Sequence, residues 1–344
     1  MNGAPVAAPS PVLRPDPPSA AARWLVVTGD DFGLAPEVNR GIVRAHREGI
    51  LRCTSLMVAA PAAAEAVQMA RATPTLDVGL HLVLVRGRAT APPRTIPGLA
   101  RADGRLREGP VAAGLAWFFR RDLRRALAVE IRAQLEAFRA TGLALSHVDG
   151  HLNVHLHPVA LDVLAEFAEE FRIPALRLAH DPVLPALRRD PTSATRKLFE
   201  GVAFRALSNR ARERLRGRGV ILADRLHGLH RSGRCDERWM LQAIDDLAPG
   251  TTEIYVHPAE EHTPFLERLM PGYRHREELA ALVSPRVRLA VERAGVEVTS
   301  WRELAASTVV PEGPERERGG SAAAVGTPGT GRVVRGFDGG RDPS

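Results

Sequence analysis

Short apolar segments alternate with longer helical segments along most of this chain, and this alternation constrains the fold more than any other feature. Alternating strands and helices are typical of a parallel sheet covered by helices. We expect strands near 23–28, 53–59, 77–83, 144–149, 174–179, 219–223, 253–257 and 296–300. We expect helices near 36–49, 61–72, 121–141, 158–172, 192–217, 236–247 and 275–294. This α/β pattern favours a TIM-like (β/α) barrel, regular or irregular, over an open doubly wound sheet, since no GxGxxG motif follows the first strand.

The two ends of the chain differ in composition from its middle. Residues 1–22 and 312–344 are poor in large apolar side chains and rich in glycine, proline and arginine. Such segments bury too little apolar surface to offset their chain entropy. We therefore expect one folded domain over 23–311 between two disordered tails. Within it, the proline-rich segment 85–114 interrupts the alternation and predicts a long loop, or a lid, after the third strand.

The chain carries a formal net charge of +7, but its basic residues do not predict a nucleic-acid partner. Lys197 is the only lysine, and most arginines are interspersed with acidic residues, which indicates a general arginine bias. We interpret the basic patches at 120–125 and 210–218 as solvated helix faces, with anionic lipid as the alternative partner. No apolar run reaches the ~18 residues of a membrane span, and residues 1–22 lack the apolar core of a signal peptide. We expect a cytoplasmic protein, with peripheral contact at the inner face of the membrane as the alternative.

Two adjacent carboxylates, Asp30 and Asp31, follow the apolar run Trp24–Thr28 where the first expected strand ends. Adjacent anions repel, so this pair is costly unless a cation or a shared proton relieves it. Turn or helix-capping residues are the alternative explanation. Histidines lie at or just past the ends of three other expected strands, namely His81, His151 and His257. Active sites of (β/α) barrels lie where the strands end, so we expect these side chains to meet there.

Asp31, His81 and one histidine of a nearby cluster would form an Asp/His/His set of metal ligands. This set suits a divalent ion such as Mg²⁺ or Zn²⁺, with open positions for water. The cluster consists of His147, His151 and His155, which are spaced four residues apart across a strand end and a loop. We expect His151 to be the ligand because it falls where the strand should end, with His155 as the alternate. His147 lies within the strand and is better explained as a core or supporting residue.

Other polar residues are candidates for acid catalysis or for substrate contact. His257, which precedes Pro258, is a candidate proton donor, and the alternative is a structural histidine held by a backbone carbonyl. His227 and His230 follow the sixth expected strand and are candidates for substrate binding. Asn39, on the first helix, is either a polar residue of the helix surface or a residue that supports or contacts the site.

Several of these motifs together resemble the YdjC-like carbohydrate deacetylases. The motifs are Thr28–Leu34, Val78–Leu82, Ser146–His151, Tyr255–Pro258 and Arg276–Leu279. The resemblance runs in order through roughly residues 23 to 303. The stretches Leu82–Val85 and Glu130–Phe138 are similar to the hopanoid-biosynthesis-associated branch of this family. Two positions depart from the family pattern: Gly29 stands where alanine is usual, and Ala259 stands where glycine is usual.

The resemblance implies metal-dependent removal of the N-acetyl group from an N-acetylglucosamine-type sugar. In that reaction Asp30 would take the proton of the attacking water, and His257, as an imidazolium, would protonate the leaving amine. Arg276, from the last motif, joins the candidates for substrate binding. The hopanoid branch implies a lipid-linked sugar, and the apolar segment Leu115–Arg121 would then rest on a membrane or simply cover the barrel. A barrel hydrolase or isomerase acting on a phosphoester or free sugar, and a non-catalytic sugar-binding protein, remain alternatives. The oligomeric state is open, and a dimer is one option.

Overall fold

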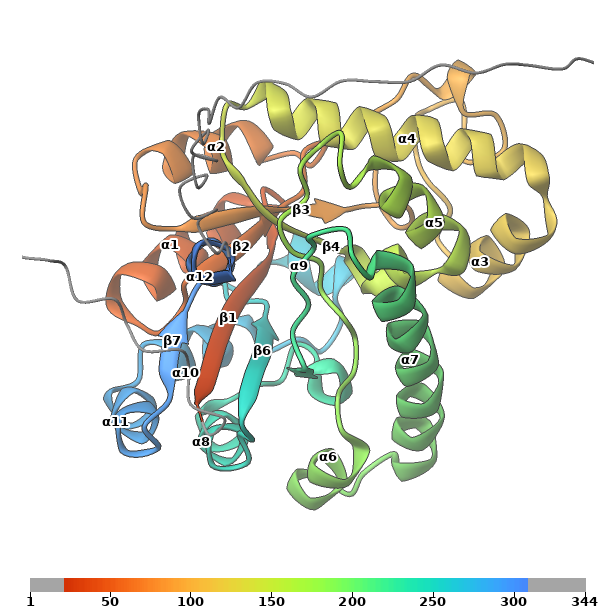
Figure 1. Ribbon diagram of the computed structural model, residues 1–344. Helices are drawn as coiled ribbons and strands as arrows, with labels where there is room; N and C mark the ends of the chain where they lie inside the picture. Colours follow the sequence, from red (N-terminus) through yellow and green to blue (C-terminus); the bar gives the residue numbers. More distant parts are fainter. Residues whose placement is uncertain (1–21, 309–344) are drawn as a thin grey trace, which may run out of the picture. The chain divides into compact units, whose positions relative to one another are not determined.

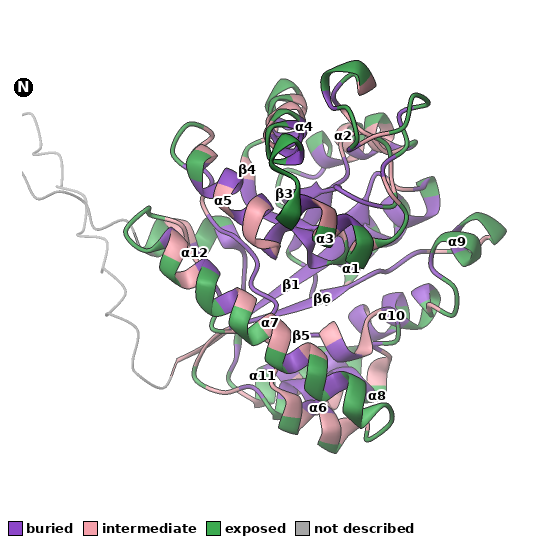
Figure 2. Cartoon of the chain, turned by 90° about the vertical axis from the view of Figure 1, so that its right-hand side faces the viewer, coloured by how far each residue is buried: buried purple, intermediate pink, exposed green. Residues whose placement is uncertain are grey.

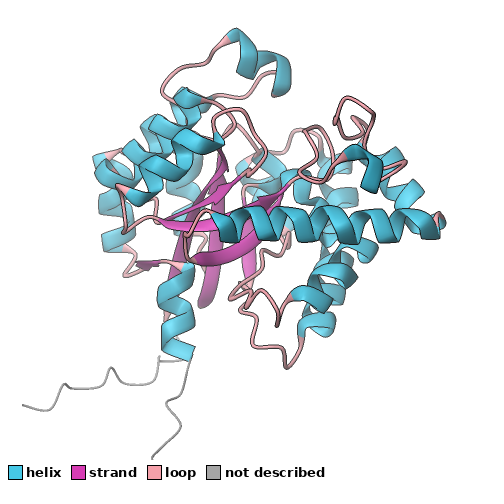
Figure 3. Cartoon of the chain, turned by 90° about the horizontal axis from the view of Figure 1, so that it is seen from above, coloured by secondary structure: helices cyan, strands magenta, loops and turns pink. Residues whose placement is uncertain are grey.

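The computed structural model describes residues 22–308 and shows a curled parallel sheet with helices packed around it (Figure 1). The sheet has seven strands in the order β4-β3-β2-β1-β6-β5, and β7 pairs with β1 as well. The strands are β1 (Arg23–Phe32), β2 (Cys53–Leu56), β3 (Asp77–Leu82), β4 (Leu145–Gly150), β5 (Arg225–His227), β6 (Gly250–Val256) and β7 (Glu297–Thr299). Viewed from above, helices surround the strands (Figure 3). The central strands are buried almost throughout, as expected where helices cover a parallel sheet.

The described residues 22–308 lack the complete eight-stranded barrel that the sequence predicted, because two of the expected strands do not form. Segment 174–180 lies between β4 and the chain near β5, where it makes single backbone hydrogen bonds instead of a ladder. Val148 N–H donates to Ala175 O at 2.9 Å, and Leu226 N–H donates to His180 O at 2.9 Å. The strand expected at 219–223 is reduced to one bridge at Ile221, and β5 begins only at Arg225. The fold is therefore an α/β half-barrel whose open side is crossed by an irregular segment.

The expected helical segments are helical in most places, and four further helices are present in the described chain. They are α1 (Pro36–Glu48), α2 (Ala63–Arg71), α3 (Pro110–Phe119), α4 (Arg121–Ala140), α5 (Pro158–Phe167), α6 (Val183–Arg189), α7 (Ala194–Leu215), α8 (Glu237–Asp245), α9 (Pro264–Leu269), α10 (His275–Leu282), α11 (Pro285–Arg293) and α12 (Trp301–Thr308). The helix expected at 275–294 is divided because Pro285 starts a new helix, whose first N–H groups donate to the Ser284 hydroxyl. The additional helices are α3, α6, α9 and α12.

The long loop predicted after the third strand runs from β3 to α3 and is held by two side chains of α4. The Gln134 side chain accepts a hydrogen bond from Val83 N–H at 2.9 Å and donates one to Val83 O at 2.7 Å. Glu130 accepts hydrogen bonds from the N–H groups of Thr90 and Ala91 at 2.8 and 3.0 Å. These buried contacts satisfy backbone groups that a loop would otherwise leave unpaired.

The tails expected at 1–22 and 312–344 fall almost entirely outside the described residues, so the expected domain limits of 23–311 stay a prediction. Across residues 22–308, none of the helices combines the length and apolarity that a transmembrane segment needs.

We predict that Gly41 in α1 is required for packing against the loop after β6. A Cβ at Gly41 would lie 2.6 Å from Ala259 Cα, which is backbone and cannot move cheaply. Overpacking of this kind costs about 1–3 kcal/mol and outweighs the roughly 0.5–1 kcal/mol that alanine gains over glycine within a helix. Gly41→Ala should therefore lower the free energy of unfolding, measured by urea denaturation.

Gly29→Ala is the matched control for this prediction. The atoms nearest to a Cβ at Gly29 would belong to side chains, Leu51 Cδ1 at 2.9 Å and Ile42 Cγ1 at 3.0 Å, which can adjust more easily than backbone. This variant should cost less than Gly41→Ala. Equal losses in the two variants would show that the close approach of α1 to Ala259 has no special role.

Candidate active site

A bulge at the end of β1 brings Asp30 and Asp31 to the same cavity. Consecutive side chains of a regular strand point to opposite faces. The pairing of β1 with β2 shifts register between Gly29 and Phe32, and Asp31 has a φ of 65°, a left-handed conformation that is rare outside glycine. Both carboxylates consequently line a cavity of about 370 Å³. Backbone strain of this kind clusters at functional sites.

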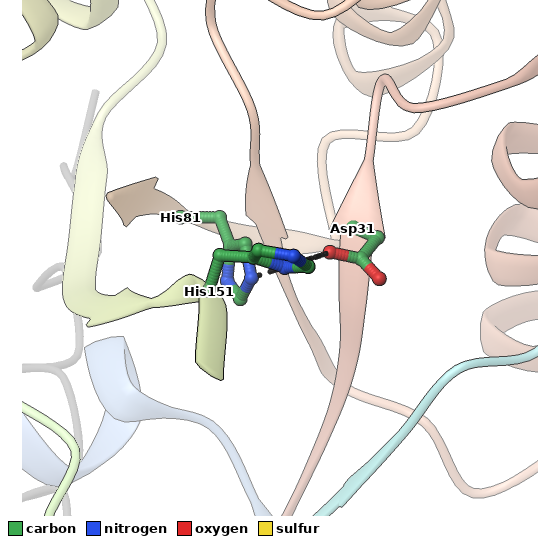
Figure 4. A group of neighbouring side chains, drawn as sticks. All are labelled: Asp31, His81 and His151. Carbon is green, nitrogen blue, oxygen red and sulfur yellow. Dashed lines mark hydrogen bonds and ion pairs between the residues drawn. The ribbon is translucent and has the colours of Figure 1, made fainter. Parts of the chain in front are cut away.

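Asp31, His81 and His151 converge at this cavity, as the sequence predicts (Figure 4). Asp31 Oδ1 lies 3.3 Å from His81 Nε2 and 3.2 Å from His151 Nδ1. One ligand atom from each residue lies within 4.8 Å of the other two. The second carboxylate oxygen, Asp31 Oδ2, is buried and has no hydrogen-bond partner among the described residues. Burial alone would raise the pKa of Asp31, but hydrogen bonds from His151 and His81 outweigh it and hold that pKa well below its usual range.

His81 is oriented from behind by Asp149 of β4. The two residues are register partners in β3 and β4, so their side chains lie on the same face of the sheet. His81 Nδ1–H donates to Asp149 Oδ1 at 2.8 Å, and Ser55 Oγ lies 3.0 Å from the same nitrogen. Burial by itself would lower the pKa of His81, but the Asp149 carboxylate raises it to about 10. A carboxylate that fixes Nδ1 and directs Nε2 into a cavity is the usual arrangement behind a metal-binding histidine.

Arg177 connects Asp30 to the rest of the site. Its guanidinium donates to both oxygens of Asp30 at 2.7 and 2.8 Å. It also donates to Glu253 Oε1 and forms an ion pair with Asp149 Oδ2 at 2.9 Å. Burial would lower the pKa of Arg177, but the surrounding carboxylates raise it well above its usual range. Sequence reasoning missed Arg177, although one charged residue inside the otherwise apolar stretch 175–179 was a usable signal.

The excess negative charge of the site favours binding of a cation beside Asp31. Three buried carboxylates, those of Asp30, Asp149 and Glu253, contact the guanidinium of Arg177. The buried carboxylate of Asp31 contacts two histidines instead, so the four carboxylates together carry more negative charge than the guanidinium balances. Asp30, His81 and Asp149 also lie close enough to share an ion. Arg177, however, already occupies the space between Asp30 and Asp149. The set of Asp31, His81 and His151 therefore fits a divalent metal better, and its donor types are those of divalent-metal hydrolases.

His257, the residue directly after β6, lines the same cavity. Its backbone N–H donates to Glu278 Oε2 at 2.6 Å, and its carbonyl accepts from His275 Nδ1–H at 2.7 Å. Burial lowers the pKa of His257 to about 4, although the charges of Asp31 and Asp30 oppose this. The imidazole is therefore neutral near pH 7 in this state, whereas the sequence-based hypothesis assumed an imidazolium.

The other two histidines of the cluster lie away from Asp31. His155 is fully buried, and its Nε2–H donates to Arg177 O at 2.9 Å, so it supports the segment that carries Arg177. His147 is also buried, with Nε2 3.7 Å from Asp149 Oδ2 and its ring near Trp301. Of the candidates for the third position, the structure brings His151 to the cluster.

The four candidates for substrate binding do not line this cavity. Asn39 Oδ1 accepts from Gly33 N–H at 2.7 Å and so fixes the turn after Asp31. His227 Nδ1 lies 3.3 Å from Asp181 Oδ1 in a buried pair. His230 lines a neighbouring cavity of about 330 Å³. Arg276 is exposed on α10; the residue of its motif that reaches the site is Glu278, whose pKa is raised to about 7 by burial.

A second, larger cavity adjoins the first. It has a volume of about 750 Å³ and shares five lining residues with the Asp30/Asp31 cavity, namely Arg86, His151, Leu269, Met270 and Pro271. Leu34, Met57, Val83 and Phe265 supply much of its apolar lining. Arg86, Arg88, Arg105 and Arg268 also contribute to its wall. The polar site thus opens into a wide apolar groove with arginines along it.

Curated relatives of this chain are named carbohydrate deacetylase, among them one from Geobacillus stearothermophilus and one from Brevibacillus brevis. The protein from Geobacillus stearothermophilus is 30% identical over 286 residues, which cover 82% of this chain and 98% of that protein. The one from Brevibacillus brevis is 42% identical over 150 residues, which cover 44% of this chain and 57% of that protein. In this second case the match spans little more than half of the relative.

The fold also has a counterpart among solved structures. A crystal structure from Enterococcus faecalis, of a protein named for cellobiose-phosphate cleavage, covers 83% of this chain and 99% of that chain with a TM-score of 0.62 and 23% identity. At that identity the likeness concerns the fold alone. The model of the YdjC-like protein family matches residues 24–293, a stretch that includes the carboxylate pair and the histidines described above. The chain therefore belongs to the YdjC-like protein family.

Proposed function

We propose that this protein is a metal-dependent carbohydrate deacetylase that removes the N-acetyl group from an N-acetylglucosamine-type sugar. The observation that carries the proposal is the convergence of Asp31, His81 and His151 beside a separately held carboxylate, Asp30. A relative that spans most of this chain is named carbohydrate deacetylase, which supports the hydrolase class. We therefore treat the chain as an enzyme that hydrolyses an acetyl–sugar linkage.

The proposed metal ligands are Asp31, His81 and His151. A divalent ion held there would polarise the acetamide carbonyl and lower the pKa of a bound water. Asp149 fixes the tautomer of His81, since it accepts the Nδ1–H hydrogen bond and leaves Nε2 facing the cavity. Asp31 Oδ2 has no hydrogen-bond partner among the described residues, so this oxygen is free to bind the ion.

Asp30 is the proposed general base. Arg177 holds both of its oxygens, so the carboxylate cannot rotate onto the ligand set and stays beside it. His257 is the proposed acid toward the sugar nitrogen. Because His257 is neutral at rest, it has to gain a proton during the reaction, and Asp30 is the group that has taken one from the attacking water. Passing that proton through His257 to the amine would leave both groups as they began.

The adjoining groove supports a substrate with an apolar portion next to its sugar. A lining of leucine, methionine and valine offers few hydrogen-bond partners to further sugar hydroxyls. The same lining suits the hydrocarbon part of a lipid-linked sugar, such as a hopanoid that carries the sugar as its headgroup. The arginines along the groove would meet polar or anionic groups near the junction.

A substrate panel tests the function. Purified protein with Zn²⁺ or Mg²⁺ should release acetate from N-acetylglucosaminides and no phosphate from sugar phosphoesters. An octyl N-acetylglucosaminide should react faster than the methyl glycoside, because its chain fills the apolar groove. Phosphate release without acetate release would favour a phosphoester hydrolase, and binding without turnover would favour a sugar-binding protein.

Within this panel, Asp30→Asn should lower kcat by roughly 10²–10⁴-fold, the usual contribution of a general base. Metal binding should persist, because the ligand set is unchanged. Asp245→Asn, at an exposed position of α8, is the matched control and should react normally. A near-normal rate for Asp30→Asn would refute the role of Asp30.

We predict that metal binding displaces a proton from His81. Below a pKa of about 10 the metal-free His81 carries a proton on Nε2, the atom that must bind the metal. Near pH 7, isothermal titration with Zn²⁺ in buffers of different ionisation enthalpy should therefore show release of about one proton from this residue. Affinity should rise with pH by up to about tenfold per unit. Tight binding without any proton release would place the metal elsewhere.

A further inference from the structure

Helix α3 carries an apolar face that nothing in the described chain covers. Four side chains of this face are 57–76% exposed: Val111, Leu115, Phe118 and Phe119. Their spacing of four, three and one residues places them along one side of the helix. The opposite side, with Ala113 and Trp117, packs into the core. Large exposed aromatic side chains are unusual on a monomer surface and mark an interaction site.

Helices α7 and α6 continue this surface. On α7, Leu198, Phe199 and Val202 are 58%, 77% and 64% exposed, and Leu184 on α6 is 73% exposed. Helices α3, α7 and α6 follow one another down the same side of the molecule, with exposed segments on each (Figure 2). We refer to these eight exposed side chains of α3, α6 and α7 as the apolar face.

The charge around the apolar face is positive. Neither α3 nor α6 contains an acidic residue. At the start of α4, Arg121 and Arg125 are exposed and have no carboxylate partner within residues 22–308. Two of the nearby acids are already paired, Asp122 with Arg120 at 2.6 Å and Glu200 with Arg196 at 3.0 Å. The exposed Glu108, just before α3, has no basic partner within residues 22–308, but the arginines of this region outnumber it. The surface therefore combines aromatic side chains with unpaired guanidinium groups.

We propose that the apolar face docks on the surface of an anionic lipid bilayer. Aromatic and aliphatic side chains would enter the boundary between headgroups and acyl chains, and the arginines would meet anionic headgroups. A second copy of this chain fits less well, because a two-fold contact would bring the same unpaired arginines together. Membrane attachment of this kind is peripheral.

The apolar face also lies close to the catalytic cavity. Phe204, two residues after Val202 and on the opposite side of α7, lines the cavity that contains Asp30 and Asp31. Docking would thus hold the cavity beside the bilayer, where a lipid-linked sugar is presented. The presentation of a lipid-linked sugar to the cavity rests on the proposed function, whereas the docking of the apolar face on a bilayer does not.

Vesicle co-sedimentation of the full chain tests the proposal. The protein should bind vesicles of phosphatidylcholine mixed with phosphatidylglycerol, bind pure phosphatidylcholine weakly, and dissociate at high salt. Phe118→Ser combined with Phe119→Ser should lower the partition coefficient by about tenfold or more. Arg121→Glu combined with Arg125→Glu should lower it by roughly tenfold at low salt.

Leu289→Ser is the matched control, since Leu289 is 43% exposed on α11, on the other side of the view in Figure 1. It should bind vesicles like the unchanged protein. Absence of binding to anionic vesicles, or binding that survives the Phe118 and Phe119 changes, would overturn the proposal. So would dimerisation through this face without vesicle binding, seen as a concentration-dependent mass that the same changes abolish.

Acetate release from a soluble glycoside separates this proposal from the proposed function. The surface variants should retain that activity, because none of the changed residues lines the catalytic cavity. If vesicles are bound but no acetate is released by any form, the function fails while the docking surface stands.

Discussion

A single buried guanidinium, that of Arg177, determines the arrangement of this site. It joins Asp30 of β1 and Glu253 of the neighbouring strand β6 to Asp149 of β4, which lies at one end of the sheet. Its carbon lies 4.8 Å from the centre of the Tyr255 ring, which adds a cation–π contact. Removing one partner of a buried ion pair typically costs about 3–5 kcal/mol, because the remaining charge is left without compensation. The network therefore fixes the open side of the half-barrel as well as the site.

This network explains how two neighbouring aspartates come to have different partners. The bulge at Asp31 turns both carboxylates to one cavity, where residues from different neighbouring segments hold each of them. Asp30 is held by Arg177, whereas Asp31 receives hydrogen bonds from His81 and His151. Each carboxylate has an environment suited to one task, a base in the first case and a metal ligand in the second. The mutual repulsion expected from the sequence is relieved by two different groups of donors.

The sequence was sufficient for the residues that end regular strands. Asp31, His81 and His151 lie at or just past the carboxyl ends of apolar strands. Parallel strands end at the same edge of a sheet, so their meeting could be predicted. Arg177 could not be assigned in the same way, because it lies within the irregular segment 174–180 and not at the end of a regular strand. The prediction of a closed barrel went too far. Segment 174–180 is apolar like a strand, but it makes only single backbone hydrogen bonds to its neighbours. In the Arg276–Leu279 motif, helix orientation selects Glu278 for the site, and the sequence pattern alone did not reveal it.

The position of the metal tests the account most directly. A crystal soaked with Zn²⁺ or Mn²⁺ should show one anomalous peak bound by Asp31, His81 Nε2 and His151, at about 2.0–2.2 Å. Arg177 should keep its two hydrogen bonds to Asp30 in the same crystal. A peak between Asp30 and Asp149, with Arg177 displaced, would contradict the division between base and ligand. The absence of any peak at a saturating metal concentration would contradict the metal site itself.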